Sequence, residues 1–384
     1  MITRIHSNRV LLRNGCVNGY VYFEDGIITA VTEKGELPFD REYDCGEDYL
    51  SPGFVDIHTH GGGGHDFAWS VEDVIEGANF HLTHGTTTVY PTVSAAPIKE
   101  MGISAGYIRE AAKDPRTLAN IGGAHLEGPY LSTRQCGAQS ASFITPPKAE
   151  DYIPLFEEYG DIIARVTYAP EEDEGGAFAK FLQARGVVAS AGHTDAGYPQ
   201  MLQAMASGCR LVTHLYSCTS TVTRKQGFRI LGVIETALLQ DELYAEIIAD
   251  GKHLPPELIR LILKAKGSDR VILITDSLSP AGTDVKSGRM QATDFIIEDG
   301  VCKLTDRSAF AGSIATADRL IRVLTGEVGV PMWEAVKMLT AIPSEVMGIN
   351  KGELAPGRDA DLLVFDDGVN IKKAFVGGVL RIGG

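Results

Sequence analysis

Residues that can bind a metal ion stand directly after several short apolar runs of this sequence. The first two form a His-x-His pair, and on an extended chain this spacing points both imidazoles to the same side. Imidazole and carboxylate groups suit zinc, iron and several other divalent ions. The residues are His58, His60, Glu127, His193, His214 and Asp276. If the runs lie side by side, these side chains meet, and the pattern then predicts a binding site for one or two divalent ions. Zinc is the first choice for the ion, and iron or another divalent ion is the alternative.

Each of these residues has a simpler explanation when it is taken alone. A single histidine is more often a hydrogen-bonded core residue than a ligand. Glu127 could be a solvated acid at the start of a loop, and Asp276 could cap a following helix. The glycine run at 61–64 could be a flexible turn as well as room for a ligand. It is the joint placement of the six residues that favours a metal hydrolase.

The elements that must bring these residues together are short apolar runs that alternate with helical patterns. This alternation predicts a parallel sheet with crossover helices. Helical patterns at 71–82 and 256–264 end before Gly85 and Gly267, and 317–347 is helix-like. The eight predicted strands are 53–57, 87–91, 121–126, 162–168, 187–191, 211–213, 244–249 and 271–275. Eight strands close a (β/α)8, or TIM, barrel, whose active face lies at the C-terminal strand ends, where the six residues stand.

The two ends of the chain have a different residue pattern. Residues 1–50 carry short β-like runs, with Asp25-Gly26 as a strong hairpin signal between two of them. The same pattern returns at 349–384. Because chain ends often lie close together, both pieces are predicted to form one small β-sandwich domain, next to a catalytic barrel at 51–348.

Composition narrows the classes of partner and location. The formal net charge of −15 opposes binding to a phosphate backbone, so nucleic acid is not expected as a partner. No stretch approaches the ~20 apolar residues that span a bilayer, so no membrane association is expected. The six cysteines form no Cys-x-x-Cys pair. They are expected to be reduced thiols, and the cytoplasm is the expected location.

The sequence resembles the N-acetylglucosamine-6-phosphate deacetylases of the amidohydrolase superfamily along nearly its whole length. Its opening and closing motifs mark the superfamily, whereas His-Leu-Glu-Gly-Pro and Ala-Asp-Gly-x-His are more specific to the deacetylases. The matching segments are 51–61, 125–129, 191–193, 213–216, 248–253, 275–276, 311–313 and 352–362.

The resemblance implies a mechanism and a substrate. Glu127 and the histidines at 193 and 214 would hold one ion, and the His-x-His pair would add a second. The metal would activate water against the acetamide of N-acetylglucosamine 6-phosphate. Asp276 would move the proton to the departing amine, and His253 would contact the substrate. Glucosamine 6-phosphate and acetate would leave, in amino-sugar catabolism, and the enzyme would be a homodimer.

Departures from the family pattern concern the sugar pocket. The chain has Ser217-Cys218 where the family commonly has Asn-Ala, and Gln139 where it has a sugar-contacting histidine. The phosphate-binding arginine of the family falls in a loop that offers three candidate cations. They are Arg224, Lys225 and Arg229. These positions are taken as substrate-binding residues, because Arg binds phosphate bidentately and Lys binds it as a point charge.

Two other functions stay open at this point. One is deacetylation of a different N-acetyl amino sugar phosphate, such as N-acetylgalactosamine 6-phosphate. Another is a non-catalytic sugar-phosphate-binding homologue. A dihydroorotase or hydantoinase is disfavoured because the predicted fourth strand ends Val166-Thr167-Tyr168-Ala169-Pro170, without the lysine that those enzymes carboxylate.

Overall fold

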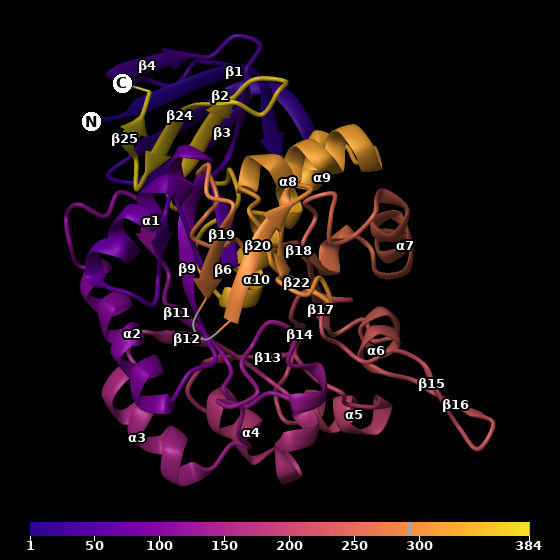
Figure 1. Ribbon diagram of the computed structural model, residues 1–384. Helices are drawn as coiled ribbons and strands as arrows, with labels where there is room; N and C mark the ends of the chain where they lie inside the picture. The colour runs from indigo at the N-terminus through magenta and orange to yellow at the C-terminus, as the bar shows by residue number, and fades with distance from the viewer. Residues whose placement is uncertain (291–292, 384) are drawn as a thin grey trace.

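The computed structural model describes residues 1–290 and 293–383, and its centre is a parallel sheet that closes into a barrel (Figure 1). The eight predicted strands are all present, with ends that differ by a few residues. In sheet order they are β6 (Phe54–Thr59), β9 (Thr86–Ser94), β11 (Ala124–Glu127), β12 (Ile163–Tyr168), β13 (Val188–Ala191), β14 (Leu211–Val212), β17 (Tyr244–Ile247) and β18 (Val271–Leu273). A short strand, β10 (Asn120–Ile121), also pairs with β9. The predicted (β/α)8 fold is confirmed.

The barrel is closed by backbone hydrogen bonds between the segments that follow its first and last strands. Asp276 donates its N–H to the carbonyl oxygen of His58 at 2.9 Å, and His60 donates to that of Ser277 at 2.8 Å. Four residues at this closure are therefore held by the main chain itself. Three of them are predicted metal ligands, so the hydrogen bonds that close the barrel also fix the backbone positions of these ligands.

Helices cover the outside of the barrel. They are α1 (Val71–Thr83), α2 (Ile98–Ala111), α3 (Ala149–Tyr159), α4 (Ala177–Gln183), α5 (Tyr198–Ala206), α6 (Val233–Leu239), α7 (Pro256–Lys266), α8 (Ala317–Val323), α9 (Met332–Met338) and α10 (Ala341–Met347). In α1, Ser70 caps the first turn by accepting the N–H of Asp73, and the helix buries Val74 and Ala78 against the sheet. Gly85, at φ +93°, follows this helix, as predicted.

Strands from both chain ends form a second sheet, as expected. Its order is β25 (Val379–Ile382), β24 (Ile371–Val376), β23 (Leu362–Phe365), β5 (Tyr49–Pro52), β1 (Thr3–Leu12), β2 (Gly15–Glu24) and β3 (Ile27–Thr32), and β4 (Arg41–Asp44) also pairs with β1. Asp25 and Gly26 both have positive φ in the turn between β2 and β3, which is the predicted hairpin. The sheet has a core of its own that includes Val21, Leu362 and Phe375.

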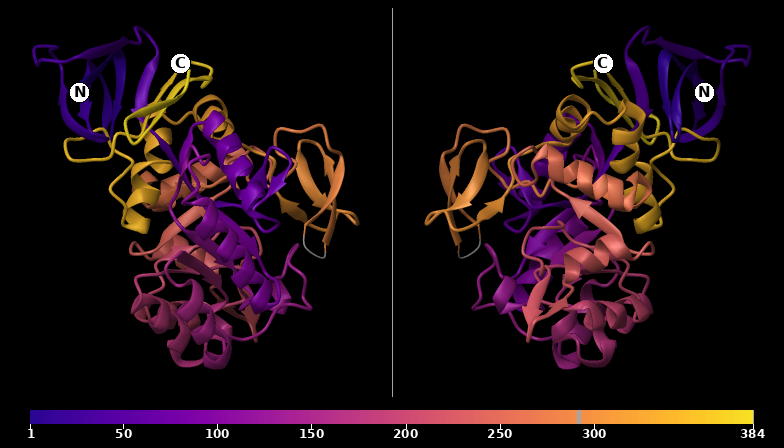
Figure 2. Two further views of the ribbon diagram at one scale, coloured as in Figure 1. Left: turned by 90° about the vertical axis from the view of Figure 1, so that its left-hand side faces the viewer. Right: turned by 90° about the vertical axis from the view of Figure 1, so that its right-hand side faces the viewer.

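Two β insertions were not predicted from the sequence. The hairpin of β15 (Thr223–Lys225) and β16 (Phe228–Ile230) projects from the body (Figure 1). A four-stranded sheet comprises β19 (Ser287–Met290), β20 (Thr293–Glu298), β21 (Val301–Leu304) and β22 (Phe310–Gly312). In both views of Figure 2 this sheet stands on the opposite side of the barrel from the terminal sheet.

Among the residues that the structure describes, no helix is both long and apolar enough to cross a membrane.

A tight turn after the first barrel strand sets the position of His60. Gly61 donates its N–H to the carbonyl oxygen of Ser277 at 3.0 Å and accepts a hydrogen bond from His81 Nε2 at 2.9 Å. Burial lowers the pKa of His81 to about 4, so this ring is neutral. A Cβ atom on Gly61 would lie 2.1 Å from the carbonyl oxygen of His65. The turn therefore accepts only glycine at this position.

We predict that Gly61→Ala lowers the free energy of unfolding by about 1–3 kcal/mol, because the added methyl group overlaps the main chain. Gly15→Ala is the matched control, since a Cβ there would meet nothing within 4 Å. Its effect should stay within about 0.5 kcal/mol. Urea unfolding of both variants and the parent measures the difference. Equal unfolding midpoints for the two variants would contradict the prediction.

Candidate metal centre

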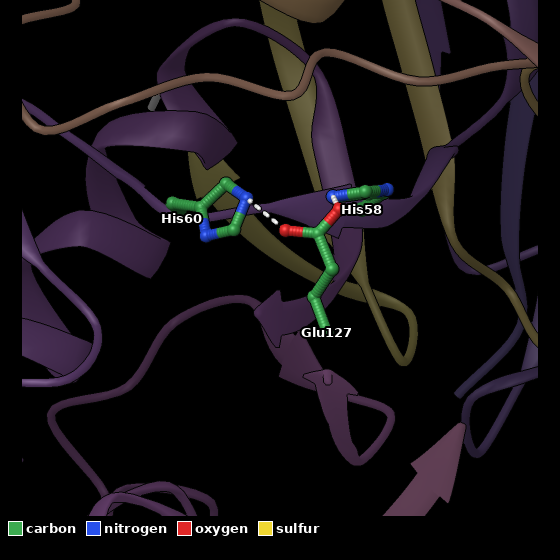
Figure 3. Close-up of side chains that lie close together, drawn as sticks. All are labelled: His58, His60 and Glu127. Carbon is green, nitrogen blue, oxygen red and sulfur yellow. Dashed lines mark ion pairs between the residues drawn. The ribbon is translucent and has the colours of Figure 1, made fainter. Parts of the chain in front are cut away.

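The structure brings all six predicted metal ligands together at the C-terminal mouth of the barrel. Each comes from the end of a different strand, except that β6 supplies both members of the His-x-His pair. None of the six is more than 8% exposed. Figure 3 shows His58 and His60 turning towards the carboxylate of Glu127, which lies between them.

Glu127 is the residue that the four histidines share. Its Oε1 lies 3.0 Å from His214 Nε2, 3.2 Å from His193 Nε2 and 3.4 Å from His58 Nε2. Its Oε2 lies 3.4 Å from His60 Nε2. Two groups of ligand atoms result, one with the His-x-His pair and one with the other two histidines, and Glu127 belongs to both. One carboxylate is thus placed to bridge two ions.

The four imidazoles all present the same nitrogen, Nε2, to this carboxylate. The opposite nitrogen, Nδ1, has a partner behind the site in three of them, and that of His58 is Glu246 Oε2 at 3.5 Å. His193 Nδ1 donates to the carbonyl oxygen of Gln135 at 3.0 Å, and His60 Nδ1 lies 3.1 Å from Ser94 Oγ. A hydrogen bond at Nδ1 fixes the ring and leaves a lone pair on Nε2, which is how metal-binding histidines are usually held.

Asp276 faces the His-x-His pair from the last strand. Its Oδ1 lies 3.2 Å from His60 Nε2 and 3.5 Å from His58 Nε2. Burial opposes ionisation of this carboxyl, but His58 and His60 outweigh it and lower its pKa. Asp276 is therefore a carboxylate at neutral pH, able to bind a cation or accept a proton.

The backbone is unusual at three of the six residues. His193, His214 and Asp276 have φ values of +47°, +28° and +47°. Side chains other than glycine seldom adopt this left-handed region, and such conformations concentrate at functional sites. All three residues line the same cavity at the mouth of the barrel.

The donor set fits a divalent metal. Burial opposes protonation of His60, yet Asp276 and Glu127 raise its pKa to about 10, which shows how strongly the two carboxylates favour positive charge between them. His58 Nε2 is buried and has no hydrogen-bond partner among the described residues. A buried orphan nitrogen beside two carboxylates suits an ion, and imidazole with carboxylate suits zinc or iron.

A cavity of about 260 Å³ opens over the centre. Four residues predicted to bind substrate line it: His253, Gln139, Ser217 and Cys218. The roof includes Met290 and Phe310 from the four-stranded insertion. His253 Nδ1 lies 2.8 Å from Asp250 Oδ2, and its ring meets that of Phe310 with centroids 4.9 Å apart. These contacts hold the His253 ring in place at the cavity wall.

Gln139 also contacts the predicted metal ligands. Its Oε1 accepts the N–H of Ala95 at 2.9 Å, so its amide group must face Glu127, and Nε2 donates to Glu127 Oε2 at 2.6 Å. The family histidine that Gln139 replaces was expected to point at the sugar. One amide hydrogen of Gln139 is used on Glu127, which leaves the second for a substrate.

The three predicted phosphate-binding cations lie elsewhere. Arg224, Lys225 and Arg229 are exposed on the β15–β16 hairpin, and none of them lines the cavity. Arg224 pairs directly with Arg229 across the two strands, so both side chains lie on one face. Their role in phosphate binding stays a prediction.

Sequence reasoning missed charged residues inside the barrel, among them Arg165 on β12 and Glu246 on β17. Both are fully buried and form an ion pair, and Glu246 Oε2 lies 3.5 Å from His58 Nδ1. The two strands were predicted from the apolar residues around Arg165 and Glu246. A single charged residue in an apolar run looks like a residue that faces outward, so neither was singled out. A signal was nevertheless present, because a barrel strand that is covered on both faces should carry few charges.

Comparison with known proteins places these features in a family. The Amidohydrolase family matches residues 49–381. The N-acetylglucosamine-6-phosphate deacetylase of Bacillus subtilis is 32% identical over 90% of this chain and 88% of its own length. That of Homo sapiens is 28% identical over 89% and 85%. The Mycobacterium smegmatis enzyme, solved as a mutant with N-acetyl-D-glucosamine-6-phosphate, superposes with a TM-score of 0.92 at 27% identity, covering 99% of both chains.

We predict that His58→Ala loses one bound ion and keeps the other, because His193 and His214 reach Glu127 without it. The mirror variant, His193→Ala, should lose the other ion. Metal analysis of each purified variant against the parent measures the loss, which should be about one equivalent. Unchanged metal content in His58→Ala would indicate a centre with a single ion.

Proposed function

The chain belongs to the amidohydrolase family and, within it, to the N-acetylglucosamine-6-phosphate deacetylases, and we propose that it hydrolyses the acetamide of N-acetylglucosamine 6-phosphate. The products are glucosamine 6-phosphate and acetate, so the enzyme is a hydrolase of a linear amide C–N bond in amino-sugar metabolism. The observation that carries the proposal is Glu127, which is shared by two pairs of histidines opposite an ionised Asp276.

The residues divide the work as follows. A divalent ion held by Glu127 and the histidines would polarise an amide carbonyl and would make water acidic enough to react near neutral pH. Asp276 accepts a proton from the attacking water and returns it to the amide nitrogen as the C–N bond breaks. The water oxygen ends on the acetyl carbon, so acetate and a free amine leave. Asp276 lines the cavity, and its Oδ1 lies 3.2 Å from His60 Nε2, so its carboxylate stands beside the centre over which the acetamide must lie.

The cavity wall is expected to hold the sugar. His253, which is fixed by Asp250, and the free amide hydrogen of Gln139 are the proposed polar contacts. Ser217 and Cys218 stand beside them. Because Gln139, Ser217 and Cys218 differ from the common family pattern, N-acetylgalactosamine 6-phosphate is the alternative substrate to compare.

The phosphate is proposed to be bound across a homodimer. Arg224 and Arg229 stand opposite each other on the hairpin, where two like charges repel unless an anion lies between them. Phe228 is 73% exposed on the same hairpin. A projecting apolar side chain suits burial against a second copy. The two arginines would then reach the partner's cavity rather than their own.

The expected location is the cytoplasm. All six cysteines are free thiols in the structure. Free thiols suit a reducing compartment, and this supports the proposal.

Acetate release from N-acetylglucosamine 6-phosphate, with and without a chelator, tests the proposed reaction. We expect release that the chelator abolishes and that added Zn²⁺ or Fe²⁺ restores. N-acetylglucosamine and N-acetylgalactosamine 6-phosphate are the comparison substrates. No release with any divalent metal would refute the proposal. Equal efficiency on the unphosphorylated sugar would refute the proposal that the phosphate is recognised. A preference for N-acetylgalactosamine 6-phosphate would identify that compound as the substrate instead.

We predict that Asp276→Asn binds substrate but lowers kcat by several orders of magnitude, because an amide cannot carry the proton. Steady-state kinetics and substrate binding by calorimetry separate the two effects. Metal content must be measured in parallel, since Asp276 also faces the His-x-His pair. Near-normal kcat with full metal content would exclude the proton-transfer role.

For the hairpin, we predict that Arg224→Gln combined with Arg229→Gln raises KM for the phosphorylated sugar roughly 10–100-fold, the loss expected for charge-assisted hydrogen bonds. The value of kcat should change little. Lys225→Gln is the matched control, because Lys225 pairs with Phe228 on the other face. An unchanged KM in the double variant, or an equal rise in Lys225→Gln, would contradict the assignment.

A further inference from the structure

The barrel interior below the metal centre contains an ion pair that stability does not explain. Arg165 and Glu246 are both 0% exposed. Replacing a buried ion pair with apolar residues of similar size is often neutral or stabilising, so such a pair is weak support for a structural role. The pair needs another explanation, and its neighbours supply one.

The arginine is held firmly. Arg165 Nη1 donates to the carbonyl oxygen of Ile57 at 2.9 Å, and Nη2 donates to Ser190 Oγ at 3.2 Å and Thr213 Oγ1 at 3.1 Å. These partners come from three different barrel strands or their ends. Arg165 is therefore a fixed positive charge that holds Glu246 in one place.

The other side of Glu246 faces the metal centre. Glu246 Oε2 lies 3.5 Å from His58 Nδ1 and accepts the backbone N–H of His214 at 3.4 Å. His58 Nε2, on the far side of the same ring, lies between Glu127 Oε1 and Asp276 Oδ1 without a hydrogen-bond partner. The His58 ring thus connects Glu246 to the two carboxylates of the centre.

We propose that Glu246, fixed by Arg165, is the positioning residue of His58 and sets the affinity of the ion that the His-x-His pair binds. A carboxylate at Nδ1 places the ring proton there, which leaves the Nε2 lone pair for the ion and makes the ring a better donor. Removing such a partner typically lowers metal affinity 10–100-fold. The inference rests on the proposed metal centre.

The effect should be confined to one ion. In Glu246→Gln, the amide oxygen can still accept the N–H of His214, but it offers no negative charge to the His58 ring. The group formed by Glu127, His193 and His214 has its own support, since His193 is held by Gln135. The ion of that group should keep its affinity.

Zn²⁺ titration of the chelator-stripped full chain by calorimetry tests the proposal. The parent should bind two ions, and Glu246→Gln should weaken one of them about 10–100-fold. Asp173→Asn is the matched control. Asp173 is a buried acid that accepts the N–H groups of Phe178 and Ala179 at the start of α4, and its loss should alter neither affinity.

The background of His58→Ala separates positioning from general damage. If Glu246 acts through His58, adding Glu246→Gln to His58→Ala should change the remaining Zn²⁺ affinity no further. Equal weakening of both ions, or further weakening in that background, overturns the proposal. A parent that binds one ion also overturns it, although acetate release that the chelator abolishes would then leave the proposed function standing.

An unpaired Arg165 can prevent Glu246→Gln from folding. Arg165→Met together with Glu246→Gln removes both charges and keeps an amide oxygen that can accept the N–H of His214, and far-ultraviolet circular dichroism checks its fold. This pair should show the same selective loss of one ion. Two Zn²⁺ affinities equal to those of the parent in this variant would overturn the proposal.

Discussion

The structure depends on the burial of two carboxylates, Glu127 and Asp276, among four imidazoles at the mouth of the barrel. Ionised acids out of water are unfavourable unless positive charge lies beside them. The raised pKa of His60 and the lowered pKa of Asp276 are two expressions of this demand. Strand order, the backbone hydrogen bonds of the closure and the left-handed residues after three strands all serve to hold these groups within reach of one another.

This demand extends below the mouth of the barrel. A (β/α)8 barrel is normally filled with branched apolar side chains. Here the interior also contains Arg165 and Glu246, with hydroxyl groups of Ser190 and Thr213 around them. The interior is polar where it supports the centre. Elsewhere the barrel strands carry buried apolar residues such as Val55, Val89 and Leu273.

Much of the fold and of the metal site could be predicted from the sequence because both follow from local patterns. The apolar runs predicted the eight barrel strands. A metal ligand at the end of one run is brought close to the ligands of the other runs as soon as the strands form a barrel. The β15–β16 hairpin was missed because its strands are short and exposed, so no apolar pattern marks them. The strands of the β19–β22 sheet are also short, and each buries only one or two residues, so their apolar pattern is weak. The contacts of Gln139 with Ala95 and Glu127 join loops distant in sequence, and no spacing indicates them.

The residues that cover the cavity are held by an apolar cluster outside the barrel. Met290 and Ala311, which line the cavity, belong to a small apolar cluster with Phe295 and Cys302 of the same insertion and Leu278 beside it. The ligands, by contrast, are anchored in barrel strands. The insertion can therefore vary in evolution while the reactive centre stays intact. A fold built in this way can take new acylated amines as substrates by remodelling one sheet, without assembling its chemistry again.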